Sequence, residues 1–241
     1  MKNSGHLGAA LVAGMVFVGV VGGVAEATPV NFVDPGEWSV GSSGSTYQAW
    51  DVFTGTTGNG PDVGYNREGD LVASSGVQVS GPYVASSGNF YGLFGEFDVT
   101  ADVVNASGGS GTGTHVVVQM ASTSSADEVK VFNGAGEEIA GAVQLRSDEL
   151  GKVFLYNMTP PGSSTPVPIY SYEDIYEFYL PDYVGDYQIV ASYAGHSSFD
   201  GLRIDSYLTD SAMSVTVVPE PAAVALLGLG GLMILQRRRK V

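Results

Sequence analysis

The sequence predicts an all-β fold, a single β-sandwich of the jelly-roll type, over residues 28–214. Short apolar runs recur along this region, and they are rich in Val, Tyr, Phe and Ile, which suit a pleated, half-buried surface. Glycine makes up 34 of the 241 residues, about twice its usual share, and gathers between the runs. Several short strands separated by turn residues are typical of sandwiches and barrels.

Residues 1–27 have the features of an N-terminal signal peptide. An apolar, glycine-rich run at 7–24 is followed by Ala25 and Ala27, which fit the small-x-small cleavage pattern. We therefore expect cleavage just after this pattern. The alternative is an uncleaved N-terminal anchor, because the apolar run is long enough to span a bilayer.

The expected strands then follow one another at short intervals. In chain order they are Tyr47–Phe53, Leu71–Ala73, Val77–Val79, Phe90–Val99, His115–Ala121, Glu128–Phe132, Lys152–Asn157, Ile169–Tyr172, Tyr187–Tyr193, Ser198–Tyr207 and Ala212–Val217. Polar and apolar residues alternate poorly in Lys152–Asn157, which indicates a strand buried on both faces. Only Tyr172–Tyr179 has helical spacing, and a strand or an irregular loop fits that segment equally well.

The last long strand shows a clear period of two. Leu202 and Ile204 point to one face of it, whereas Arg203 and Asp205 point to the other. The segment Ser198–Tyr207 resembles the closing strand of jelly-roll sandwiches of the carbohydrate-binding and lectin-like kind.

The C-terminal residues 215–241 form a tail in three parts. Pro219, Glu220 and Pro221 precede an uncharged apolar segment at 222–235, and a basic stop of Arg237, Arg238, Arg239 and Lys240 follows. As a helix the apolar segment would cover about 21 Å, less than the roughly 30 Å of a hydrocarbon core. The prolines favour an extended, accessible tripeptide at the membrane edge. The basic cluster would hold the other end in the cytoplasm.

In its order of parts the tail resembles the PEP-CTERM sorting signal of bacterial envelopes, which an exosortase handles. The resemblance implies transport across the inner membrane of a bacterium with an outer membrane, an anchored intermediate, and removal of the tail. An exosortase-type enzyme is the implied partner. Composition alone would also fit a plain C-terminal membrane anchor.

Charge excludes one large class of function. Residues 28–218 hold 23 acidic and 5 basic residues, a net charge of −18. A nucleic-acid binder needs a basic footprint, so we expect no nucleic-acid partner. The same charge opposes adhesion to anionic lipid, and it suits a soluble exported protein or one that meets divalent cations.

Several kinds of catalytic site are missing from the sequence. The chain has no cysteine, and its three histidines lack the spacing of a metal motif. The G-x-S-x-G and Walker A patterns are absent too. A glycoside hydrolase working through two carboxylates remains a third-ranked hypothesis, because any acidic sandwich contains pairs of carboxylates by chance.

Two kinds of binding site can be formulated from residue types. Asp34, Glu37, Asp200 and Asp205 would supply hard oxygen ligands for calcium if the first and last strands pair. Solvated surface carboxylates are the alternative. Trp38 and Tyr47 are candidates for stacking on sugar rings, and we expect Trp38 to be exposed between its Pro and Gly neighbours. We expect no cofactor other than calcium.

These observations favour a structural function without catalysis. The expected protein is an exported component of the cell surface or of an extracellular matrix, with extracellular polysaccharide as a partner. The alternative is a carbohydrate-binding, lectin-like module, with or without a requirement for calcium. The membrane would be contacted only through the C-terminal tail, before processing.

Overall fold

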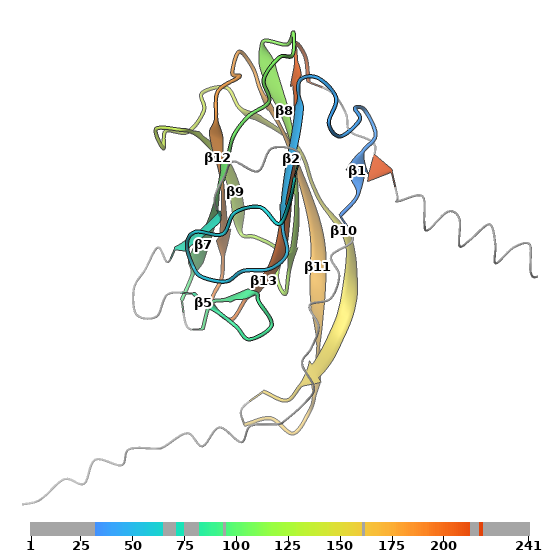
Figure 1. The fold of residues 1–241 in the computed structure, drawn as a ribbon. Coiled ribbons are helices and arrows are strands. Elements are labelled where there is room, and N and C mark those ends of the chain that lie inside the picture. Colours follow the sequence, from blue (N-terminus) through green and yellow to red (C-terminus); the bar gives the residue numbers. More distant parts are fainter. Residues whose placement is uncertain are drawn as a thin grey trace, which may run out of the picture.

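The computed structural model describes residues 32–64, 71–74, 82–93, 95–160, 162–212 and 217–218 (Figure 1). Its strands are β1 (Asp34–Pro35), β2 (Ser45–Trp50), β3 (Val63–Gly64), β4 (Leu71–Ser74), β5 (Tyr83–Val84), β6 (Phe90–Tyr91), β7 (Phe97–Val103), β8 (Gly113–Ser122), β9 (Glu128–Asn133), β10 (Val143–Met158), β11 (Val167–Leu180), β12 (Tyr187–Tyr193), β13 (Ser198–Thr209) and β14 (Val217–Val218). The described residues contain no helix, and hence none that could cross a membrane. The predicted signal peptide, the strand at Val77–Val79 and the tail from Pro219 onward lie outside the described residues.

Two antiparallel sheets pack face to face, so the predicted all-β sandwich is confirmed. The larger sheet runs in the order β10-β11-β8-β13-β2-β3, and β5 and β6 attach to it at β13. The smaller sheet runs β4-β7-β12-β9. A third, two-stranded sheet pairs β1 with β14. Every strand pair of the three sheets is antiparallel.

The core between the two sheets is built by alternation along the strands. β7 and β12 both follow a strict buried-intermediate pattern, which is the pattern of a sheet with one face on the core and one toward solvent. The largest fully buried side chains are Trp50, Phe53, Phe90, Phe97, Tyr187, Tyr193 and Phe199. Leu202 and Ile204 enter this core, as their period of two predicts.

The larger sheet is also covered on its outer face. Residues 32–40, here called the strap, cross this face, and they bury Trp38 against Val117 and Ile175. Strands β8 and β13 are therefore buried on both faces. The segment Tyr172–Tyr179, for which the sequence left helix, strand and loop open, is part of strand β11.

The hairpin of β10 and β11 projects beyond the sandwich (Figure 1). Strand β8 ends at Ser122, opposite Tyr172, so residues 153–158 and 167–171 extend past it and pair with each other. We call these residues the arm. The prediction that Lys152–Asn157 is buried on both faces is wrong, because Val153, Phe154 and Tyr156 are all substantially exposed.

Candidate functional site

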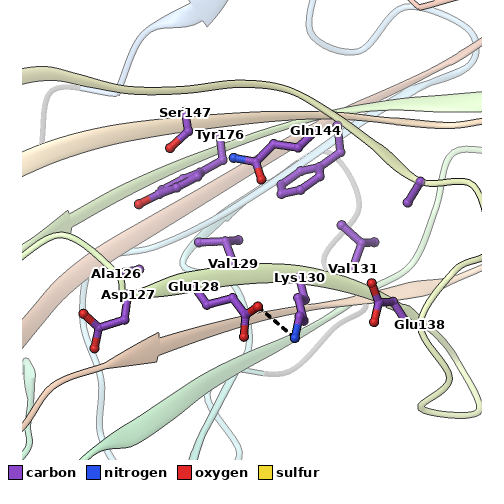
Figure 2. A pocket seen from close by; sticks show the side chains of 12 residues that line it. Ala126, Asp127, Glu128, Val129, Lys130, Val131, Glu138, Gln144, Ser147 and Tyr176 are labelled. Atoms are coloured by element: carbon purple, nitrogen blue, oxygen red, sulfur yellow. Dashed lines mark ion pairs between the residues drawn. The ribbon is translucent and has the colours of Figure 1, made fainter.

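A groove opens at one side of the sandwich, between the edge strand of the smaller sheet and the β10–β11 hairpin (Figure 2). Its volume is about 370 Å³. Figure 2 shows Tyr176, Gln144 and Ser147 on one wall, facing Val129 of β9 across the gap, while Lys130 points away from them toward Glu128. Its walls come from β9 of the smaller sheet and from β10 and β11 of the larger one.

The lining of the groove combines an aromatic floor with polar groups. Burial raises the pKa of Tyr176 to about 12, with a further contribution from Asp174, so its hydroxyl stays protonated at neutral pH. Lys130 is paired with Glu128 at 2.8 Å, and Glu138 lies at the rim. A protonated hydroxyl and an amide beside an aromatic ring are groups that bind neutral polyols by hydrogen bonds and stacking.

A buried ion network lies on the outer face of the larger sheet, beneath the strap. The Arg203 guanidinium donates to both carboxylate oxygens of Asp205, at 2.7 and 2.9 Å, and to Asp34 of β1 at 2.6 Å. It also sits over the ring of Tyr47, with its central carbon 5.2 Å from the ring centroid. Burial raises the pKa of Asp205 to about 6, although Arg203 acts in the opposite direction.

The strap is attached to this face by hydrogen bonds. The amide of Gln119 donates to the Val33 carbonyl at 2.7 Å and accepts from the Val33 N–H at 2.8 Å. Gln119 thus pairs with a backbone segment as a neighbouring strand would. The side chain is 2% exposed, which means that the strap seals it from water.

The two aromatic candidates for sugar stacking are part of the same buried region. Trp38 is 8% exposed and stacks on Tyr207 with ring centroids 5.5 Å apart, so the prediction that it is exposed is wrong. Tyr47 is half-buried and has one face occupied by Arg203. Trp50 is fully buried in the core. Packing of the strap therefore accounts for Trp38, and Tyr47 supports an ion network.

The four carboxylates proposed for calcium are distributed over different contacts. Asp34 and Asp205 converge, but on Arg203. Asp200 is bonded by the hydroxyls of Ser198 and Ser171. Glu37 acts electrostatically on His115. In the parts of the chain that the structure describes, no group of three His, Asp or Glu residues is arranged to hold a metal ion.

His115 is a buried titratable residue that the sequence did not single out for any role. Burial lowers its pKa to about 4, with Glu37 acting in the opposite direction. Its Nε2 atom is 3.9 Å from the Glu177 carboxylate, and Trp38 lies over its ring at 5.8 Å. A histidine of this kind stays neutral near pH 7 and packs as part of the sheet.

Sequence reasoning missed the groove and the network for different reasons. The groove is lined by consecutive strands, but β9 joins the smaller sheet and β10 and β11 the larger one, and no local sequence signal shows that assignment. The network had one local signal, since Arg203 and Asp205 alternate with apolar residues on a strand. A charged pair at such positions suggests a covered second face.

Comparison with known proteins identifies one segment. Residues 217–240 match the family model of the PEP-CTERM protein-sorting motif, in agreement with the resemblance of the tail. No curated protein and no solved structure gives a significant match to this chain. The motif implies sorting by an exosortase, export, and an intermediate anchored in the membrane.

Proposed function

We propose that this chain is a structural component of the cell surface or extracellular matrix, and that it acts without catalysis. The observation that carries the proposal is the PEP-CTERM motif at residues 217–240, which marks the chain as exosortase-sorted. The body attached to this motif is an acidic β-sandwich. Its buried charges Arg203 and Asp205 are bonded to each other, which is a structural use of ionisable groups.

Polysaccharide is the partner we propose for this body. A net charge of −18 over residues 28–218 keeps the exported protein soluble. Divalent cations would bridge its exposed carboxylates to acidic sugars, because hard cations prefer oxygen ligands. This association would be weak at each contact and would gain strength from many contacts.

Cell fractionation tests the sorting step. Replacing Glu220 with Ala, or the cluster from Arg237 to Lys240 with Ser, should leave the full-length protein in the inner membrane. Wild type should be recovered at the cell surface or in the medium. The matched control is Glu138→Ala, a surface carboxylate far from the tail in sequence, which should sort normally. Normal release of both tail variants would contradict the proposal.

A deletion strain tests the structural role itself. Loss of the chain should weaken matrix cohesion or change retention of polysaccharide, and a chain with normal sorting should restore it. A deletion that leaves the matrix unchanged, but abolishes turnover of a glycan, would replace the structural role with an enzymatic one.

The groove favours a second candidate, a carbohydrate-binding function. Tyr176 offers a ring and a protonated hydroxyl, and Gln144 and Ser147 offer further hydrogen-bonding groups on the same wall (Figure 2). This combination is common where proteins bind sugars with modest affinity.

A glycan array probed with the full chain tests this second candidate, with millimolar calcium and again with chelator. Binding should weaken about tenfold in Gln144→Ala, because a hydrogen bond to the ligand is lost. Gln188→Ala is the control, since Gln188 lies on the smaller sheet and bonds to Asp102. Equal binding by both variants, or no binding in either condition, would remove the groove from consideration.

A further inference from the structure

Strand β10 leaves a long edge of the larger sheet open. Its 16 residues pair with β11 on one side, and among the described residues no strand pairs with its other side. The opposite edge of the same sheet is β3, which has only two residues. On the smaller sheet, Ile139 and Glu138 partly cover the edge of β9. A long, exposed strand edge is a template for pairing with another chain.

The residues of β10 are complementary to a second copy of the same strand. If two copies pair antiparallel over their whole length, Val143 of one copy lies opposite Met158 of the other. Further pairs then join Gln144 with Asn157, Leu145 with Tyr156, Ser147 with Phe154, and Glu149 with Lys152, and between them Arg146 lies opposite Leu155 and Asp148 opposite Val153. At both ends apolar residues meet apolar residues and an amide meets an amide, and beside the two-fold axis an acid meets a base, whereas Arg146, Ser147 and Asp148 lie opposite apolar residues. The two-fold axis passes between Leu150 and Gly151.

The directions of the side chains agree with this pairing. Opposite β11, Glu149 faces Asp174 and Lys152 faces Tyr172, which are two residues apart and share one face of the sheet. By the same register, Val143 and Met158 both lie on the other face. Against β11, β10 has irregularities near Leu145, Leu150 and Leu155, and each shifts the register by one residue.

The exposed apolar side chains of β10 support the same pairing surface. Val143, Leu145, Tyr156 and Met158 are 39–54% exposed, and they form the two apolar pairs at each end of the paired strands. Contiguous exposed apolar groups of this size mark interaction sites in soluble proteins. A two-stranded ribbon such as the arm is marginally stable in water by itself, so pairing with further strands would stabilise it.

Charge explains why this surface suits a second copy of so acidic a protein. Residues 28–218 carry a net charge of −18, and two such bodies repel each other. Residues 153–172 contain no charged side chain, and the paired strands would bring two Glu149–Lys152 pairs into contact. The edge of β10 is thus a place where two copies can approach with little local repulsion.

We propose that β10 is a homodimer interface, through which two copies pair antiparallel over Val143–Met158 and join their larger sheets into one. The interface is isologous, with the same residues contributed by both copies. This inference stands on the geometry of β10, and it depends neither on the sorting motif nor on polysaccharide binding.

A charge exchange tests the register. Sedimentation velocity of the full chain in mild non-ionic detergent should show a concentration-dependent dimer. Glu149→Lys and Lys152→Glu should each weaken the dimer about tenfold or more, because each places like charges opposite each other at two places. The double variant E149K/K152E should restore wild-type affinity. Glu128→Lys, on β9, is the control and should leave the dimer unchanged.

A covalent link provides a second measurement. The chain has no cysteine of its own, so introduced thiols are the only ones present. Directly opposed residues of antiparallel strands are close enough for a disulfide. The double variant E149C/K152C should form a cross-linked dimer on oxidation. The control E149C/V153C places its thiols on opposite faces of the sheet and should cross-link poorly.

Three results would overturn the proposal. One is a wild-type chain that remains monomeric at its highest soluble concentration. Another is a dimer that E149K and K152E leave unchanged, or that the double variant fails to restore while circular dichroism shows native structure. The third is efficient cross-linking by both cysteine variants, which would indicate contact without a defined register.

Discussion

The residue that best explains the covered outer face is Arg203. Arg203 is only 8% exposed. Removing its guanidinium charge from water would be costly without partners. Asp205 offers two oxygens in the geometry of the guanidinium fork, Asp34 offers a third, and Tyr47 offers a ring face. The strap therefore contributes one of the partners that allow a charge to sit in the sheet.

Removing one partner should be more harmful than removing the pair. Asp205→Ala should lower the free energy of unfolding by about 3–5 kcal/mol at pH 7, because it leaves a buried guanidinium without its main counter-ion. Asp34→Asn should cost about 1 kcal/mol or less, because the Asp34 carboxylate is 64% exposed. The double variant R203M/D205L should recover much of the loss. Urea unfolding measures all three, and equal losses in D205A and the double variant would contradict this account.

Two buried groups have opposite effects on stability between pH 4 and 6.5. The pKa of Asp205 is about 6 in the folded chain against 3.8 for a free side chain, so its contribution is complete below pH 3.8 and is lost as the pH rises through 6. The pKa of His115 is about 4 against 6.5, so its contribution is complete above pH 6.5 and is lost as the pH falls through 4. The contributions of Asp205 and His115 therefore largely offset each other over this range.

Single variants should reveal how each of these two groups makes stability depend on pH. In Asp205→Asn the free energy of unfolding should increase by about 3 kcal/mol more than in wild type as the pH rises from 4 to 6.5, since only the His115 contribution then varies strongly. His115→Asn should give a slope of the opposite sign. Urea unfolding at a series of pH values measures both. Profiles parallel to wild type in both variants would show that neither group titrates as described.

At the scale of the element, the strap is held to the sheet by the Gln119 amide, by the Arg203–Asp34 pair and by the packing of Trp38. Gln119→Leu keeps the volume and removes both hydrogen bonds to Val33. We expect the amides of residues 32–40 to exchange with solvent about tenfold faster, while global stability changes less. Gln188→Leu, which removes a bond to Asp102 on the smaller sheet, is the control. Hydrogen exchange by mass spectrometry distinguishes them, and unchanged protection of the strap in Gln119→Leu would contradict its role.

The strands also show which features of the fold can be predicted from the sequence and which cannot. Alternation along β7, β12 and the Leu202–Ile204 stretch predicted the inward faces correctly, because that signal is local. Lys152–Asn157 was mispredicted because a run without alternation looks the same whether both faces are covered or both are open. The place where β8 ends decides between these cases, and that is a property of a different segment.

Trp38 was mispredicted for a related reason. Proline and glycine neighbours indicate an irregular segment, and irregular segments lie mostly on the surface. The strap is irregular and on the surface, but its tryptophan points inward to Tyr207 and His115. Predicting the direction of that side chain requires knowing that the outer face of the sheet is apolar around Val117 and Ile175.

For the whole molecule, the dominant property is its negative charge. A chain of 25 acidic and 10 basic residues, with half of the basic ones at the two ends, has a strongly anionic body. Repulsion between such bodies extends over the Debye length, roughly 30 Å at 0.01 M salt and 10 Å at 0.1 M. Local attraction at β10 involves only the two Glu149–Lys152 pairs, and surface pairs of this kind contribute little.

The balance between repulsion of the two acidic bodies and attraction at β10 determines how the dimer responds to salt. Raising NaCl from low to moderate concentration should strengthen dimerisation through β10, because screening removes more repulsion between the bodies than attraction at the interface. Sedimentation velocity at several salt concentrations measures this. Neutralising two body carboxylates remote from β10, in Asp98→Asn/Asp102→Asn, should reduce the response. Weaker dimerisation at higher salt would mean that opposite charges hold the two copies together, and the apolar pairs of β10 would then not be the main source of affinity.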